Sequence, residues 1–134
     1  MPQDIELLAL IMEREGYLTR QQVQHAMAVQ QHQVTLGRAF SFGEVAVKLT
    51  FCTDTDVRYA QSIEARLEVP AGQRRPLGYY LLEAGALLPS QLLEGLEEQA
   101  FYGSRLGEIL VRNGWVAEPD IERALAQQKA TVPG

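Results

Sequence analysis

Leucine and glycine recur at fixed distances in the C-terminal half of the chain, so that residues 76–99 and 105–128 carry nearly the same pattern. In each stretch a Leu-Gly pair is followed by a Leu on the third residue after the Gly, then by a second Gly, two aliphatic residues and a closing Gln. The first copy has Leu77, Gly78, Leu81, Gly85, Leu92, Leu96 and Gln99, and the second has Leu106, Gly107, Leu110, Gly114, Ile121, Leu125 and Gln128. Such repetition predicts that both copies fold as the same unit.

The apolar positions of each copy have the spacing of a short helix followed by a longer one. Gly85 and Gly114 each follow the first helical run, where a Gly in the left-handed conformation commonly closes a helix. The aliphatic residues recur at helical periods and are expected in the hydrophobic core. They are Leu81, Leu92, Leu96, Leu110, Ile121 and Leu125.

The N-terminal half repeats this pattern in degenerate form. One copy starts near residue 7 and keeps the second Gly as Gly16, followed by Thr19 in the position of a helix cap. Another starts near residue 41, and there Thr50 occupies the position of the second Gly. Thr53 with Asp56 indicates a further helix N-terminus, so the pair of Asp54 and Asp56 is expected to stabilise that helix start rather than to bind a metal.

The four units together predict an all-α fold of stacked short helical hairpins, with four related repeats in two pairs. Residues 1–64 would form the N-terminal pair of degenerate repeats, residues 65–75 a connector, and residues 76–134 the C-terminal tandem pair. Hairpins of this kind cannot bury their apolar faces alone, so we expect stability to come from stacking.

Composition and charge narrow the classes of partner. The chain of 134 residues has 46% apolar and 22% charged residues, which is typical of globular proteins. A formal net charge of −5 would repel a long polyanion, so no nucleic-acid partner is expected. The N-terminal apolar run is too short for a signal peptide or a membrane span, so we expect a cytoplasmic protein without direct membrane insertion.

No catalytic or metal-binding pattern occurs in the sequence. It contains no GxxxxGK[ST] phosphate-binding loop, no HExxH and no GxSxG. His25 and His32 could share one helix face, but no further ligand accompanies them at a recognisable spacing. The single cysteine, Cys52, lies in an apolar run and is expected to be a buried structural thiol. We therefore expect neither an enzyme, nor a metal protein, nor a bound cofactor.

The tandem over residues 76–128 resembles the MshEN domain, the N-terminal domain of type II secretion and type IV pilus assembly ATPases. That family carries two motifs of the form RLGxxLxxxGxxxxxxLxxxLxxQ, which together hold one molecule of cyclic di-GMP. Here the second copy has the opening Arg as Arg105, whereas the first has Pro76, directly after Arg74 and Arg75. The resemblance implies a cyclic di-GMP site formed by Leu77, Gly78, Gln99, Arg105, Leu106, Gly107 and Gln128, with Arg75 as the candidate to replace the missing Arg.

The resemblance also implies a function. It suggests a free-standing bacterial regulatory module that binds cyclic di-GMP and signals to a partner protein, such as an ATPase or platform component of a secretion or pilus system. The alternative is a ligand-free interaction adaptor related to the N-terminal domains of secretion ATPases. The degenerate repeats and Pro76 favour that alternative.

The residues themselves leave both readings open. The missing side chain at Gly78 and Gly107 would let a phosphate or carbonyl approach a helix start, but close helix packing also requires Gly. The amides of Gln99 and Gln128 suit a base edge and are equally common as solvated groups at helix ends. The guanidinium of Arg105 suits phosphate or the O6/N7 edge of guanine. Loss of the matching Arg in the first copy would cost roughly 1–3 kcal/mol of binding energy.

Overall fold

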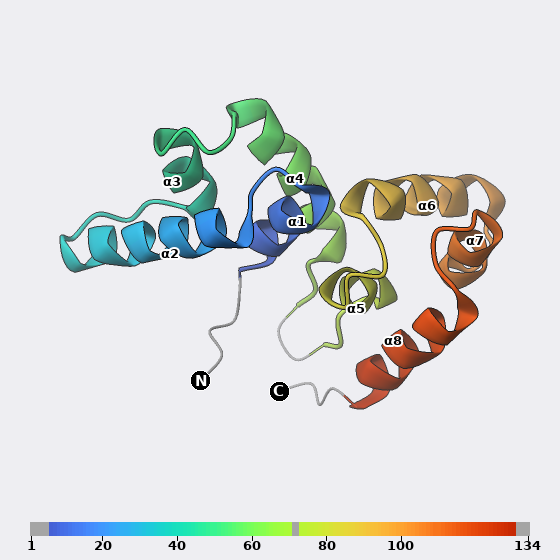
Figure 1. The fold of residues 1–134 in the computed structure, drawn as a ribbon. Helices are drawn as coiled ribbons and strands as arrows, with labels where there is room; N and C mark the ends of the chain where they lie inside the picture. The colour runs from blue at the N-terminus through green and yellow to red at the C-terminus, as the bar shows by residue number, and fades with distance from the viewer. Residues whose placement is uncertain (1–5, 71–72, 131–134) are drawn as a thin grey trace. The chain divides into compact units, whose positions relative to one another are not determined.

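A computed structural model of the chain describes residues 6–70 and 73–130, and all regular structure in those ranges is helical (Figure 1). Each short helix is followed by a longer one, which confirms the all-α fold and the four hairpins predicted from the sequence. In chain order the helices are α1 (Leu7–Glu15), α2 (Arg20–Thr35), α3 (Phe42–Lys48), α4 (Asp54–Leu67), α5 (Leu77–Glu83), α6 (Pro89–Tyr102), α7 (Leu106–Arg112) and α8 (Glu118–Ala130).

The hairpins fall into two compact units, Met1–Glu64 and Ala65–Gly134. Helix α4 continues to Leu67, so residues 65–67 of the expected connector are helical. In the second unit α5 packs against α8 and α6 packs against α7, so each short helix lies on the long helix of the other hairpin (Figure 1). In the first unit α3 packs against α2 in the same way. None of the helices in the described ranges is long and apolar enough to cross a membrane.

The core is built from the same positions of the repeat in every hairpin. The second and third residues after the first Gly position are always buried, as Ile11 and Met12, Val45 and Ala46, Tyr80 and Leu81, and Ile109 and Leu110. Among the residues expected in the core, Leu92 is buried as well. The expectation was wrong for Leu125, which is 40% exposed, and Leu96 and Ile121 are only partly buried. Ile121 and Leu125 line a pocket that the last hairpin leaves open.

A small residue in the middle of each long helix is a further buried repeat position, which the sequence pattern did not include. These residues are Ala26, Ala60, Gly95 and Ala124. A Cβ added to Gly95 would lie 2.9 Å from Leu110 Cδ2 and 3.1 Å from Leu106 Cδ1, so α6 and α7 approach closely there. This regularity is present in the sequence, because each of the four residues follows the first Gly position of its own copy at the same distance. In the first copy Ala9 occupies that Gly position.

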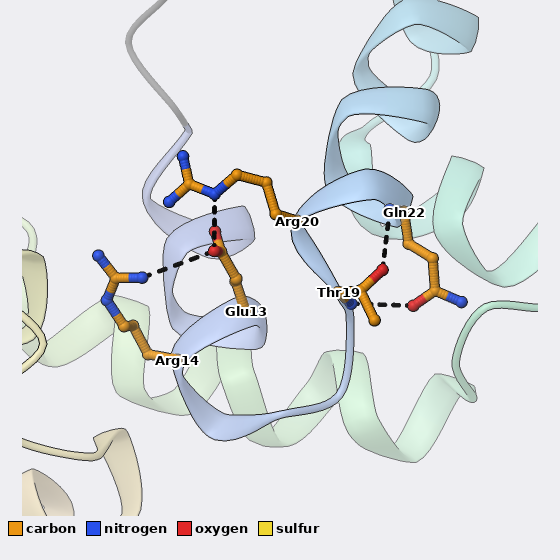
Figure 2. Close-up of polar contacts among 5 residues, drawn as sticks. All are labelled: Glu13, Arg14, Thr19, Arg20 and Gln22. Atoms are coloured by element: carbon orange, nitrogen blue, oxygen red, sulfur yellow. Dashed lines mark hydrogen bonds and ion pairs between the residues drawn. The ribbon is translucent and has the colours of Figure 1, made fainter.

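Polar contacts close the turn of the first hairpin (Figure 2). Thr19 Oγ1 accepts a hydrogen bond from the Gln22 N–H at 3.1 Å, and the Thr19 N–H donates to Gln22 Oε1 at 2.9 Å, which confirms the predicted cap. Glu13 Oε1 lies 3.0 Å from Arg20 Nε and 3.6 Å from Arg14 Nη1. The contact with Arg20 joins the end of α1 to the start of α2.

The other long helices begin in the same way. Thr53 and Asp56 exchange two hydrogen bonds of 3.1 and 3.2 Å, so Asp56 is a capping group, as predicted. At the starts of α6 and α8 a backbone N–H donates to Gln91 Oε1 and to Asp120 Oδ2, both at 3.1 Å. A side chain that caps its own helix therefore recurs at one repeat position in all four hairpins.

A residue in the left-handed backbone conformation lies in the turn of each hairpin. Gly16, Gly85 and Gly114 have φ angles of 91°, 76° and 75°, which confirms the turns predicted at these positions. Thr50 takes the same conformation with φ 61° although it carries a branched side chain. For residues other than Gly this conformation costs about 1–2 kcal/mol.

Thr50→Gly should raise the free energy of unfolding by roughly 0.5–1 kcal/mol, because relief of the steric cost exceeds the added backbone entropy of Gly in the unfolded chain. Chemical denaturation of both proteins measures the difference. The reverse change at the equivalent position, Gly114→Thr, is the matched control and should lower the free energy of unfolding. A Thr50→Gly variant no more stable than the parent would show that Thr50 is not strained.

Candidate functional site

A pocket of about 690 Å³ lies in the second unit, where the start of α7 meets α8. Leu77, from the first copy of the motif, lies at its wall beside Arg105, Leu106 and Gly107 from the second copy. The other lining residues are Glu108, Val111, Arg112, Glu118, Ile121, Glu122 and Leu125. The volume is within the range usual for small-molecule sites. Four of the residues expected to bind ligand are thus brought together.

The local backbone explains how the second copy forms this pocket. Arg105 precedes α7 with an extended backbone (φ −67°, ψ 140°), and its side chain is exposed. A Cβ added to Gly107 would lie 3.4 Å from Ile121 Cγ2 and 3.8 Å from Leu77 Cδ2. These are close to ordinary van der Waals distances, so α7 and α8 are not in tight contact at Gly107. The resulting gap leaves Leu106 and Ile121 only partly buried.

Charged groups of both signs surround the apolar wall. Glu108, Glu118 and Glu122 supply carboxylates, and Arg105 and Arg112 supply guanidinium groups. Arg112 Nη2 lies 3.6 Å from Glu98 Oε2 in α6, so that guanidinium already has an anionic neighbour. The pocket therefore offers hydrogen-bond acceptors to a ligand as well as the donors of Arg105.

Gly78 lies away from the pocket and serves helix packing. It is buried, and a Cβ added to it would lie only 2.7 Å from Cδ1 of the fully buried Leu92. Gly43, at the same repeat position in the first unit, gives 2.8 Å to Val57 Cγ1. The two copies of the tandem motif therefore differ, since the first closes over its Gly and the second leaves Gly107 at an open pocket.

The closing Gln of the motif fastens hairpins together. Gln128 Nε2 donates to the backbone carbonyl of Arg75 at 3.0 Å, and Gln30 Nε2 donates to the carbonyl of Phe40 at 3.0 Å. Both carbonyls belong to the segment just before the short helix of the other hairpin in the same unit. Gln99 is half-buried near the end of α6, and its carbonyl accepts from the Gly103 N–H at 2.8 Å. The pocket lining includes neither Gln99 nor Gln128.

Arg75 also lies outside the pocket lining. Its guanidinium carbon is 4.4 Å from the ring centroid of Tyr79, a distance typical of a cation–π contact. Pro76 follows with an extended backbone (φ −63°, ψ 158°) and leads into α5. Burial, together with a hydrogen bond to Glu83, raises the pKa of Tyr79 to about 12. Arg75 opposes this rise because its positive charge favours the phenolate.

The described residues give little support for a metal site or for a reactive cysteine. No group of three or more His, Cys, Asp and Glu side chains within residues 6–70 and 73–130 could hold a metal ion. Cys52 is partly rather than fully buried, and it occupies the repeat position of the buried residues Leu18, Leu87 and Val116. Burial raises the pKa of its thiol, with Asp56 and Asp54 adding to the effect, so the reactive thiolate is disfavoured at neutral pH.

Comparisons of the chain with protein-family models, with curated proteins and with solved structures give no significant match. The resemblance to the MshEN domain therefore rests on the residues of the tandem motif alone. The geometry described above adds that these residues divide into two groups. Leu77, Arg105, Leu106 and Gly107 line the pocket, whereas Gly78, Gln99, Gln128 and Arg75 lie elsewhere in the same unit.

Gly78→Ala should lower the free energy of unfolding by about 1–2 kcal/mol, because the new methyl group overlaps Leu92 in a filled core. Gly107→Ala is the matched control at the same repeat position. It should leave the free energy unchanged or raise it by up to about 1 kcal/mol, through helix propensity. Urea denaturation of both variants tests the pair, and equal losses would contradict the difference in packing.

Tyr79 should ionise near pH 12 rather than near pH 10. The folded state favours its protonated form, so this contribution to stability is complete below pH 10 and is lost as the pH rises through 12. Ultraviolet absorbance of tyrosinate, recorded as the difference between the parent and Tyr79→Phe, measures the midpoint. A midpoint near pH 10 with the helices intact by circular dichroism would contradict the burial of this phenol.

Proposed function

We propose that the second unit is a regulatory module that binds cyclic di-GMP and passes this signal to a partner protein. One observation carries the proposal: residues from both copies of the tandem motif converge on one pocket of about 690 Å³. Leu77, Leu106 and Ile121 supply an apolar wall against which a purine face could pack. Arg105 supplies a planar fork suited to phosphate or to the O6/N7 edge of guanine.

The polar rim supports a guanine ligand in particular. Guanine presents N–H donors on its Watson–Crick edge, and exposed carboxylates at Glu108, Glu118 and Glu122 are suitable acceptors. The same carboxylates repel phosphate, so the phosphates would lie toward Arg105. One guanosine of the ligand would therefore occupy the pocket, and the two copies of the motif would not act as equal half-sites.

The first copy of the motif supports weaker and asymmetric binding. Leu92 covers Gly78, and Pro76 replaces the opening Arg. The absence of one bidentate base contact costs about 1–3 kcal/mol, or roughly 5- to 150-fold in affinity. Arg75, exposed beside Tyr79, directly precedes Pro76 in the sequence. It is therefore the residue that would replace the missing Arg and contact the second half of the ligand.

Signalling would work through the packing of α5 on α8. The pocket is lined by α5, α7 and α8, so a ligand in it would bind both hairpins at once. A bound ligand favours the conformation it contacts, and it can therefore change a surface that a partner recognises. The resemblance points to an ATPase or platform component of a bacterial secretion or pilus system as the partner, with the module acting in the cytoplasm and catalysing no reaction.

The second candidate function is a ligand-free adaptor for protein interaction. Gly78 and Gln128, two residues of the motif, contribute to packing between helices and hairpins. Phe101 and Tyr102, at the end of α6, are 85% and 75% exposed, and exposed aromatic side chains are enriched at protein interfaces. In this function the motif would persist as a folding pattern.

Calorimetric titration of cyclic di-GMP into the protein tests the proposal. We expect one ligand per chain in the micromolar range, with GMP as the control ligand. Arg105→Ala should weaken binding by roughly 5- to 150-fold, since a bidentate contact contributes about 1–3 kcal/mol. Arg66→Ala, which removes an exposed arginine outside the pocket, should leave the affinity unchanged. Absence of binding by the folded parent would leave the adaptor as the function.

A further inference from the structure

The first unit contains the counterpart of the pocket, position by position. Leu8, Phe42, Gly43 and Val57 occupy the repeat positions of Leu77, Leu106, Gly107 and Ile121. The contacts agree as well. A Cβ added to Gly43 would meet Val57 and Leu8, and a Cβ added to Gly107 would meet Ile121 and Leu77. The same repeat positions therefore meet around this point in both units, with a closer approach at Gly43 (2.8 Å) than at Gly107 (3.4 Å).

The counterpart is filled in the first unit. Leu8, Phe42 and Val57 are only 3%, 0% and 8% exposed. Their equivalents Leu77, Leu106 and Ile121 are partly exposed and line the pocket. Phe42 has the largest side chain among these residues, and it is completely buried where the smaller Leu106 leaves space.

The polar lining differs in the same comparison. Ser41 occupies the position of Arg105, Arg58 that of Glu122, and Gln61 that of Leu125. The first unit thus has no arginine at the position of Arg105, and an arginine replaces the carboxylate of Glu122. The first unit therefore differs from the second in the arrangement of charged groups as well as in space.

We infer that the residue directly before the first Gly of the second hairpin in each pair decides whether that pair has an open ligand pocket. Leu106 leaves the pocket open in the second unit, and the Phe42 ring fills the corresponding space in the first. The identity of the ligand rests on the proposed function. The effect of this side chain on the size of the pocket does not. In residues 6–64, the described part of the first unit, these positions accordingly form packed core rather than an open site.

Leu106→Phe is the direct test, because Phe is already accommodated at the equivalent position of the first unit. The variant should remain folded, with an unchanged or higher melting temperature, and should lose at least tenfold in affinity for cyclic di-GMP. Leu88→Phe, the same change at an exposed leucine outside the pocket lining, is the matched control and should bind as the parent does. A Leu106→Phe variant that is folded and binds cyclic di-GMP like the parent would overturn the inference.

A second ligand separates this inference from the proposed function. The dye 1-anilinonaphthalene-8-sulfonate, whose aromatic rings bind apolar pockets, should bind the parent and Leu88→Phe with one site more than Leu106→Phe, as judged by fluorescence titration. If the parent binds the dye in this way but not cyclic di-GMP, the proposed function fails and the inference stands. Equal dye stoichiometry in the parent and in Leu106→Phe would overturn the inference even if cyclic di-GMP binds.

Phe42→Leu, made in the Leu106→Phe background, keeps the test decisive if Leu106→Phe binds the dye weakly for another reason. It should restore one dye site while unfolding remains a single cooperative transition with an unchanged dependence on denaturant. Failure of the folded double variant to regain the site would also overturn the inference, because the space at position 42 would then not be set by the Phe ring.

Discussion

The fold depends on close approach of helices at positions that lack a side chain. Gly78 lets α5 lie against Leu92 of its own hairpin, and Gly95 lets α6 lie against Leu110 of the next one. The short helices α5 and α7 have 7 residues each, too few to be stable alone. They are helical because the long helices cover them, and that cover is possible only where the backbones come near. Loss of either close contact would leave a short helix without the packing on which it depends.

Much of this architecture could be predicted from the sequence, because it is local. Helical periods, the turns at Gly85 and Gly114 and the cap at Thr19 are each set by residues within a few positions of one another. The exchange of short helices between hairpins is a long-range feature, and the repeat pattern alone does not reveal it. For the same reason the exposure of Leu125 was not foreseen, since its helical period is that of a core residue and only the neighbouring helices determine whether it is covered.

In the candidate site, too, long-range contacts decide the role of residues that the sequence pattern leaves open. Leu77, Arg105, Leu106 and Gly107 come together because the first residues of α5 and α7 converge. The amide of Gln128 instead meets a carbonyl distant in sequence, and Gly78 meets a leucine of its own hairpin. Residue type and spacing were equally compatible with ligand binding and with packing at these positions, and the tertiary contacts distinguish them. The repeat thus supplies one scaffold whose equivalent positions serve as core in one place and as pocket wall in another.

The hydrogen bond from Gln128 to the Arg75 carbonyl brings together residues close to the two ends of the tandem pair. The polypeptide therefore enters and leaves this part of the molecule at nearly the same point. A module with adjacent ends can be inserted into a surface loop of another protein, or joined to a further domain, without disturbing the packing of its own core. Because these two ends are joined, tension on either flanking segment would act on the hydrogen bond between Gln128 and Arg75, beside Pro76 and the start of α5.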